Sequence, residues 1–317
     1  MLLIDAAYVH DLLTYRDCIP VMADAMQMLS SGTTEQMLRN ILPLDHGRMF
    51  GIMAGTMGPG GAWGAKLVSV TPERADPSIP SHQGVVILFD PASGAPACQV
   101  EAGAVTAIRT ASASAMATDR LARADAGVAA IIGTGEQAWH HALAMREVRE
   151  ISEMRVWGRS TQNARALADR LSQETDCPIV VSETVQQAVD GADMISTVTA
   201  AREPVLLADW VQPGAHINLV GSSFDGPREI DNALIARSRL FADSSASVRA
   251  QGAEFRHALK SGAISDAHLL GEIGEVLSGK IDGRVGADDI TIYNSLGHVI
   301  QDIAAAALIF QKARAGA

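Results

Sequence analysis

The chain has 317 residues, with 25 Lys and Arg against 36 Asp and Glu and a formal net charge of −11. This length allows about two domains, and a hydrophobic fraction of 48% excludes a mostly disordered protein. The acidic balance argues against binding to nucleic acid or to anionic membranes, because few cations remain to neutralise phosphates.

The sequence also bears on the compartment. Its longest apolar runs are shorter than the ~20 residues that a membrane helix needs. The N-terminus, MLLIDAAYVHDLL, contains an acid at Asp5 and has no basic region, unlike a signal peptide. Cys18, Cys98 and Cys177 are far apart and match no disulfide framework or metal-binding spacing. We therefore expect a cytoplasmic protein without a metal site.

The N-terminal third shows mixed α and β patterns. Apolar residues recur at helical spacing through residues 17–29, which predicts a helix. Short strand-like runs follow at 49–53, 65–70, 84–90 and 97–100, separated by joints rich in Pro and Gly. This order predicts a sheet rich in hairpins and covered by a helix.

From residue 126 onward, strands alternate with helices. Residues 127–132 (GVAAII) form a continuous apolar run, as expected of a strand buried on both faces. Further strands are predicted at 154–157, 179–181, 194–198, 216–220, 240–242 and 289–293, and helices at 136–148, 161–173 and 299–312. This alternation predicts βαβ units, a parallel sheet and the α/β fold class.

A glycine-rich turn, GTGEQA at residues 133–138, follows the first of these strands and opens a helix. This is the G-x-G-x-x-A pattern in the context of a dinucleotide site. Gly133 permits a tight turn, Gly135 lets a pyrophosphate approach the backbone, and Ala138 lets the helix pack closely on the strand. The helix N-terminus favours phosphate there. An ordinary glycine turn is the alternative interpretation.

The second strand of this domain ends at Gly158, near the place where NAD-selective sites usually carry an acid for the ribose 2′-hydroxyl. Arg159, Ser160 and Thr161 follow and are able to donate to a 2′-phosphate. We therefore predict NADPH as the cofactor, with NADH as the alternative. The simpler interpretation is a solvated arginine followed by a helix cap.

Three isolated cations stand among apolar or small residues: Arg39, Lys66 and Arg109. Buried cations need an anionic partner. A substrate carboxylate suits two guanidinium groups, and a desolvated Lys66 is a candidate general acid. Ion pairs with the protein's own acids are an equally good explanation of each cation. His82 lies in a polar insert and is a candidate ligand contact or a solvated loop histidine.

These segments resemble the ornithine cyclodeaminase/mu-crystallin family along nearly the full chain. The matching segments are QMLRNILP around Arg39, AKLVS around Lys66, IPSHQGVVILFDPASG (79–94), AVTAIRTASASA (104–115), GTGEQA (133–138), REPVL (202–206), VQPGAHINLVGSS (211–223), REID (228–231), GEIGEVLSGK (271–280) and YNSLGHVIQD (293–302). Each is short, but their order and spacing together are specific.

The resemblance implies a mixed α+β domain for substrate binding and dimerisation over residues 1–118, to which a C-terminal helix at 298–317 returns. It implies a Rossmann-type NAD(P)-binding domain over 119–297 and a homodimer. Arg39, Lys66 and Arg109 would be catalytic, with Met53 and His82 lining the same pocket. The implied cofactor contacts are Thr110, Gly133, Gly135, Glu136, Gln137, Arg159, Ser160, Thr161, Thr199, Ser222, Ser223, Ser295, Gly297 and His298.

One position departs from part of this family. Ornithine cyclodeaminases carry an aspartate that serves ring closure where this chain has Ser223, in GSSFDGPRE, with Asp225 two residues downstream. The segment is more similar to the reductase branch of the family. We therefore expect NADPH-dependent reduction of a cyclic ketimine carboxylate, with Δ1-pyrroline-2-carboxylate or its piperideine homologue as substrate. An alanine-type dehydrogenase, an ornithine cyclodeaminase using Asp225 and an idle binder of NADPH are the alternatives.

Overall fold

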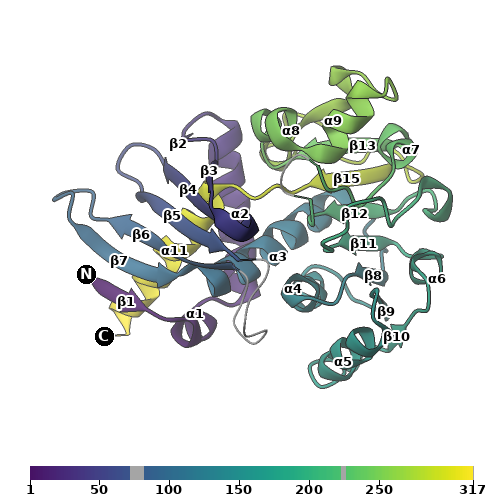
Figure 1. Cartoon of the computed structure of the whole chain (residues 1–317), viewed down its shortest axis with the longest axis horizontal. Coiled ribbons are helices and arrows are strands. Elements are labelled where there is room, and N and C mark those ends of the chain that lie inside the picture. The colour runs from purple at the N-terminus through teal and green to yellow at the C-terminus, as the bar shows by residue number, and fades with distance from the viewer. Residues whose placement is uncertain (72–81, 223–225, 317) are drawn as a thin grey trace. The chain divides into compact units, whose positions relative to one another are not determined.

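The computed structural model describes residues 1–71, 82–222 and 226–316 of an α/β protein. The chain divides into two compact units, one of Met1–Arg109 with His298–Ala317 and one of Thr110–Gly297 (Figure 1). The first unit ends at Arg109, earlier than the boundary expected at 118. The reason is that α3 (Ala102–Leu121) is one continuous helix, whose second half belongs to the second unit.

The first unit contains a seven-stranded sheet of order β1-β7-β6-β5-β4-β2, with β3 also paired to β4. Its strands are β1 (Leu2–Ile4), β2 (Glu35–Gln36), β3 (Asn40–Pro43), β4 (Met49–Thr56), β5 (Trp63–Val70), β6 (His82–Phe89) and β7 (Pro96–Glu101). All pairs are antiparallel except β1 with β7. The four predicted strands are confirmed as β4 to β7, while β1, β2 and β3 are too short to show a periodic pattern.

The helices of this unit are α1 (Ala6–Leu12), α2 (Tyr15–Ser30), a short helical turn η1 (Asp45–Gly47), the first half of α3 and α11 (Val299–Ala315). The predicted helix at 17–29 is confirmed as α2, whose N-cap is Thr14. The C-terminal helix α11 packs against β4, β5, β6 and α2 (Figure 1). Most of α11 is buried, as expected of a helix that is apolar on nearly all sides.

The second unit contains an eight-stranded, entirely parallel sheet of order β10-β9-β8-β11-β12-β15-β13-β14. Its strands are β8 (Val128–Ile132), β9 (Glu153–Trp157), β10 (Ile179–Val181), β11 (Met194–Thr197), β12 (His216–Leu219), β13 (Ser238–Ala242), β14 (Leu269–Glu272) and β15 (Ile290–Asn294). The chain builds outward from β8 to β10 and then returns to β11 on the other side of β8. This reversal is the switch point at which doubly wound sheets bind ligands.

Helices and helical turns connect these strands: α4 (Glu136–Met145), α5 (Thr161–Leu171), α6 (Val185–Val189), η2 (Ala208–Trp210), α7 (Asn232–Arg237), α8 (Ser245–Gln251), α9 (Ala253–Lys260), η3 (Asp266–His268) and α10 (Ile273–Leu277). Two apolar clusters pack in this unit. Ala130 and Ile132 of β8 belong to one, and Ala129 and Ile131 to the other. Because successive side chains of a strand point to opposite faces, this explains the continuous apolar run predicted to be a strand.

Neither a membrane-spanning helix nor a metal cluster occurs in the part of the chain that the structure describes. Within residues 1–71, 82–222 and 226–316, no helix has the length and apolar character that a membrane span requires. The same part of the chain contains no group of three or more His, Cys, Asp or Glu side chains placed to hold a metal ion.

Candidate functional site

The glycine-rich turn lies between β8 and α4, at the carboxyl edge of the parallel sheet. Gly133 has a φ of +138°, and a Cβ there would lie 2.7 Å from the Val198 carbonyl oxygen, so only glycine fits. Gly135 is the N-cap of α4 in extended conformation, with open space where its side chain would be. Ala138 is fully buried in the apolar cluster between β8 and α4. The turn therefore has the geometry predicted for a pyrophosphate cradle.

The ends of the strands beside this turn lie in one row. Thr197 pairs with Ile132 on one side and with Leu219 on the other, and Leu219 pairs with Asn294. The turns after β8, β11, β12 and β15 therefore meet at the same edge. These turns carry the predicted residues Thr199, Ser222, Ser295 and Gly297.

Buried polar atoms in the second unit lack hydrogen-bond partners within the part of the chain described. They include Thr110 Oγ1, Gln137 Oε1, Ser295 Oγ and both amide atoms of Asn294. Leaving such an atom unpaired costs roughly 1–3 kcal/mol, so their presence suits a ligand that supplies the missing bonds. Thr110, Gln137 and Ser295 were predicted contacts of the dinucleotide, whereas Asn294 at the end of β15 was not. The residues present thus fit a dinucleotide.

The segment after β9 agrees with both interpretations made from the sequence. A Cβ at Gly158 would lie 2.3 Å from Thr134 Cγ2, so an acidic side chain there would displace Thr134. Arg159 is exposed. Ser160 is the N-cap of α5 and accepts a hydrogen bond from the Asn163 amide at 3.3 Å, so the capping role is confirmed. Its position beside Arg159 is unaffected by that role.

The remaining predicted cofactor residues are placed as follows. Thr161 is the first residue of α5 and Glu136 the first of α4, and both are exposed. Ser222 is buried. Gly297 has a φ of +81° and donates its amide hydrogen to Asp243 Oδ2 at 2.7 Å. Ser223 and the side chain of His82 lie outside the described residues, as does Asp225.

A buried carboxylate, Glu229, joins the ends of β11 and β12. Its Oε1 accepts from the amide and hydroxyl of Thr199 at 2.6 and 2.7 Å. Its Oε2 accepts from the Thr197 hydroxyl at 2.9 Å and the Gly221 amide at 2.7 Å. Burial raises the pKa of Glu229, against the effect of these four donors. The hydroxyl of Thr199, a predicted cofactor contact, is therefore occupied by Glu229 in this structure.

A second buried acid, Glu254 of α9, binds the backbone of Glu229. Its Oε1 accepts from the Glu229 amide at 2.9 Å, and the side chain is 1% exposed. Burial raises the pKa of Glu254 to about 7, although the hydrogen bond from Glu229 opposes this. Neither acid was predicted as a site residue. Glu229 stands within REID, where the neighbouring charged residues Arg228 and Asp231 give no sign of burial.

Two of the three predicted cations meet in the first unit. Lys66 Nζ on β5 and Arg109 Nε on α3 donate to the same oxygen, Asp302 Oδ1 on α11, at 2.9 and 3.0 Å. All three side chains are almost completely buried. The alternative of an internal ion pair is therefore confirmed for Lys66 and Arg109. One carboxylate nevertheless leaves this buried group with a net positive charge.

The charge of the third cation, Arg39, affects the protonation of Lys66. Arg39 lies between β2 and β3, half-buried. Burial lowers the pKa of Lys66 to about 8, and the charge of Asp302 opposes this, while the charges of Arg109 and Arg39 contribute to it. Burial by itself would raise the pKa of Asp302, but Arg109 and Lys66 together hold it below its ordinary value.

Two further predicted residues lie beside this cluster. Met53 on β4 is directly opposite Lys66 in the antiparallel register and is 6% exposed. His298 is the N-cap of α11 and is 6% exposed. Burial lowers its pKa to about 4 against the charge of Asp302, and Arg109 and Arg39 lower it further. His298 is therefore neutral at physiological pH.

The structure adds three supporting residues that the sequence reasoning missed. Thr106 Oγ1 accepts from Lys66 Nζ at 2.6 Å, and Gln301 Oε1 accepts from Arg109 Nη1 at 2.6 Å. Asp302 is the third. It is an isolated acid in the apolar stretch VIQDIAAAALIF, the same signal that singled out the cations. That signal applied to acids would have found it.

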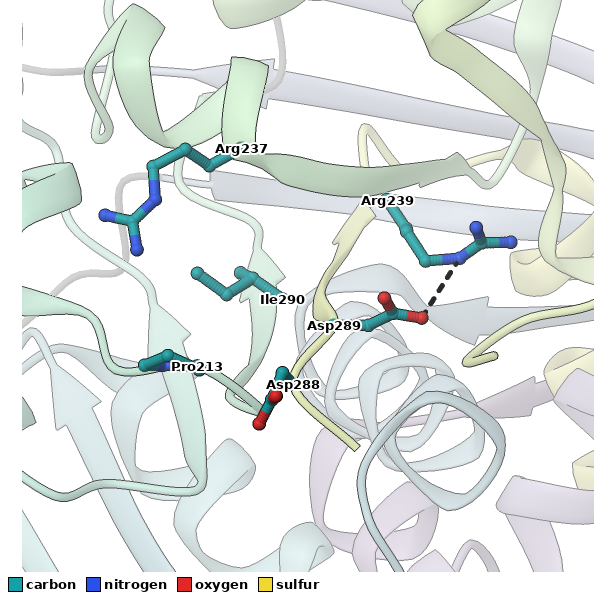
Figure 2. A pocket seen from close by; sticks show the side chains of 6 residues that line it. All are labelled: Pro213, Arg237, Arg239, Asp288, Asp289 and Ile290. Carbon is teal, nitrogen blue, oxygen red and sulfur yellow. Dashed lines mark ion pairs between the residues drawn. The ribbon is translucent and has the colours of Figure 1, made fainter. Parts of the chain in front are cut away.

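Figure 2 shows a pocket at the opposite edge of the parallel sheet, where β13 and β15 begin. It is lined by Pro213, Arg237, Arg239, Asp288, Asp289 and Ile290. Arg239 Nε lies 3.7 Å from Asp289 Oδ2. Arg237 Nη1 donates to the Ala208 carbonyl at 2.7 Å. Balanced charges and internal partners give this pocket no surplus charge for a substrate anion.

The comparisons with known proteins agree with the geometry. The model of the ornithine cyclodeaminase/mu-crystallin family matches residues 1–317. The chain belongs to this family. The ketimine reductase mu-crystallin of Mus musculus is 34% identical over 302 residues, covering 94% of this chain and 92% of that protein. The expected family, fold class and oxidoreductase assignment are confirmed.

Two solved structures are also similar over the whole chain. One is Δ1-pyrroline-2-carboxylate reductase of Thermococcus litoralis in complex with NADH and L-proline, with a TM-score of 0.96, 32% identity and coverage of 100% of this chain and 98% of that one. The other is a dimeric archaeal alanine dehydrogenase with bound NAD, with a TM-score of 0.93, 26% identity and coverage of 100% and 97%. A nicotinamide cofactor is thus common to both.

Proposed function

We propose that this enzyme reduces the C=N bond of a small cyclic imino acid with NADPH, and that Δ1-pyrroline-2-carboxylate, which yields proline, is its leading substrate. The observation that carries the proposal is the surplus positive charge at Lys66, Arg109 and Asp302. A buried group of this kind suits a ligand with one negative charge, because a carboxylate completes its neutralisation. The similarity to a pyrroline-2-carboxylate reductase supports the same substrate class.

The unpaired buried atoms of Thr110, Gln137 and Ser295, together with the turn at Gly133, support dinucleotide binding. A bound nicotinamide supplies the hydride for the reaction. The preference for NADPH rests on Arg159, which is exposed beside Gly158 and is suited to a 2′-phosphate. The two similar solved structures contain NADH and NAD, which support a nicotinamide cofactor of either kind.

The residues of the chain orient and protonate the substrate. Arg109 and Arg39 hold its carboxylate and so fix the ring. The imine carries a proton on nitrogen, so the ring carbon bearing the carboxylate accepts hydride and the C=N bond becomes CH–NH. Lys66 hydrogen-bonds the carboxylate or supplies the proton. Arg109 ends the first unit and Thr110 begins the second, so a substrate contact and a cofactor contact are consecutive residues of α3.

We further propose that the enzyme is a cytoplasmic homodimer. Six large apolar side chains from residue 37 to 52 are exposed, on and beside the edge strand β3: Met37, Leu38, Ile41, Leu42, Leu44 and Ile52. Exposed apolar side chains gathered on an edge strand favour association. Light scattering during gel filtration tests this proposal, since a dimer has twice the chain mass of 33.3 kDa. A mass of one chain would contradict it.

A spectrophotometric screen tests the activity. Oxidation of NADPH and of NADH is followed with five- and six-membered cyclic imino acids and with pyruvate plus ammonia. A separate assay measures the release of ammonia from ornithine, which involves no net oxidation of the cofactor. We expect oxidation of NADPH with the imino acids. Faster turnover of pyruvate with ammonia would establish an alanine-type dehydrogenase instead. Release of ammonia and proline from ornithine would establish a cyclodeaminase, and no turnover on the whole panel would contradict catalysis.

A further inference from the structure

Asp302 lies in the first turn of α11 and is fully buried. Its Oδ1 receives both Lys66 Nζ and Arg109 Nε, whereas its Oδ2 has no hydrogen-bond partner among the described residues. A buried carboxylate is costly unless it is paired. The two cations are therefore what stabilises the carboxylate at this place, and the carboxylate in turn fixes the two cations relative to each other.

The hydrogen bonds of the two cations leave one N–H of Lys66 and three N–H of Arg109 without a protein acceptor named above. Lys66 Nζ donates to Asp302 and to Thr106, whose hydroxyl itself donates to the Ala102 carbonyl at 2.5 Å and so must accept from lysine. A protonated lysine has three donors, and these contacts use two of them. Arg109 is held through Nε by Asp302 and through Nη1 by Gln301. The remaining lysine hydrogen and the Nη2 group are therefore the donors that a substrate carboxylate would use.

The charges of the cluster also favour an external anion. Lys66 and Arg109 carry two positive charges in a buried place, and Asp302 carries one negative charge. Within this buried trio, not counting the half-buried Arg39, the acid thus reduces the surplus to the single charge that a substrate carboxylate matches. Arg39 and the neutral His298 are the other ionisable groups that act on this cluster. Without Asp302, Lys66 and Arg109 would lose their shared anion, and Lys66 is the one of the two that is able to lose its proton.

We propose that Asp302 is a positioning residue of the reaction, which aligns Lys66 with Arg109 and keeps Lys66 protonated for the substrate. This inference rests on the proposed function, since it assigns the role within that reaction. It extends the substrate site from the three cations to the first turn of α11, with Gln301 as the neutral second support of Arg109.

The test compares Asp302→Asn with the matched control Asp17→Asn. Asp17 also holds a lysine, Lys312, at 2.6 Å in the same unit, but both side chains are partly exposed. For Asp302→Asn we expect kcat at pH 8 to fall at least tenfold and to recover in part at pH 6, because Lys66 deprotonates at lower pH without the acid. The control should keep kcat within twofold. A folded Asp302→Asn variant with unchanged kcat and pH profile would overturn the inference.

Asp302→Glu serves if the amide variant does not fold, because it keeps the charge and displaces it by one methylene. We expect its alkaline limb to stay in place while kcat falls at least tenfold, and an unchanged kcat would overturn the positioning role. A second readout needs no turnover: the pH dependence of Lys66 acylation, followed by mass spectrometry. Reactivity should move to lower pH in Asp302→Asn, and an unmoved reactivity would overturn the inference. A wild-type enzyme that reduces no imino acid would overturn the proposed function alone.

Discussion

Lys66 Nζ lies 2.9 Å from Asp302 Oδ1, although 236 positions separate the two residues in the chain. The pair joins β5, inside the seven-stranded sheet, to the first turn of the C-terminal helix. Because Arg109 binds the same carboxylate oxygen, three distant segments meet at one buried charge cluster. The cluster is the part of the molecule on which the proposed chemistry depends most.

Replacing Lys66 or Arg109 by Met should lower kcat/KM for the imino acid by about 100-fold or more, because either change removes the surplus positive charge and misplaces the substrate. Each variant leaves Asp302 with one cation, so the fold should persist. Binding of NADPH, followed by fluorescence, should stay within twofold. Lys312→Met is the matched control and should retain activity. Full activity in either cluster variant would remove the assigned roles.

The lowered pKa of Lys66 has opposite effects on activity and stability. With a pKa of about 8 in the folded protein, activity that needs the protonated amine falls as the pH rises through 8. The unfolded chain keeps this proton up to about 10.5 and so binds more protons between these values, which means that the lysine's contribution to the free energy of unfolding rises with pH there. Activity profiles and urea unfolding of wild type and Lys66→Met check both signs. An activity limb that stays flat to pH 10 would contradict the first.

Replacing Arg159 by Ala should raise the Kd for NADPH about 10- to 100-fold, the value of a charge-assisted contact, and leave the Kd for NADH within twofold. Arg165, which is also exposed but lies on α5, provides the control variant Arg165→Ala. Calorimetric titration with both cofactors measures the effect. Equal losses for NADPH and NADH would assign Arg159 to the shared part of the dinucleotide.

Glu229→Gln should destabilise the second unit by roughly 3 kcal/mol, because one carboxylate oxygen becomes an amide donor that faces backbone and hydroxyl donors. The Thr199 and Gly221 amides need acceptors on different oxygens, so the substitution leaves one unsatisfied in either orientation. Urea unfolding measures the loss. Glu203→Gln, at an exposed ion pair with Arg228, should cost less than about 1 kcal/mol. Equal stability of both variants would show that the buried network is dispensable.

Three buried histidines predict a loss of stability in acid. Burial lowers the pKa of His141 to about 4, of His216 to about 3 and of His298 to about 4, from an ordinary value of 6.5. The unfolded chain therefore binds more protons between pH 6.5 and 4, so the free energy of unfolding decreases as the pH is lowered, by up to about 1.4 kcal/mol per pH unit for each histidine. Urea midpoints should drop from pH 7 to pH 5. The drop should shrink in His216→Asn and stay unchanged in His46→Gln, whose side chain is 84% exposed.

Local patterns in the sequence were sufficient for the parallel sheet and the glycine turn. The run at 127–132 and the following helix appear as β8 and α4, because a buried strand and a helix N-terminus have local signatures. The isolated cations Lys66 and Arg109 were found by the same means, since burial of charge is unusual enough to stand out. Asp302, the carboxylate that binds both cations in the structure, also stands isolated among apolar residues of the sequence.

The sequence did not predict which residues bind Lys66 and Arg109 in the folded protein. Whether Lys66 and Arg109 bind an internal acid, a substrate or both depends on where α11 packs, and helical periodicity says which face is apolar but not what that face meets. The same holds for Glu229, whose four donors come from two strand ends brought together by parallel pairing. Sequence alone therefore determined the elements, the family resemblance and the unusual charges. Tertiary packing decided the pairing and protonation of those charges, because contacts across hundreds of residues leave no periodic trace in the chain.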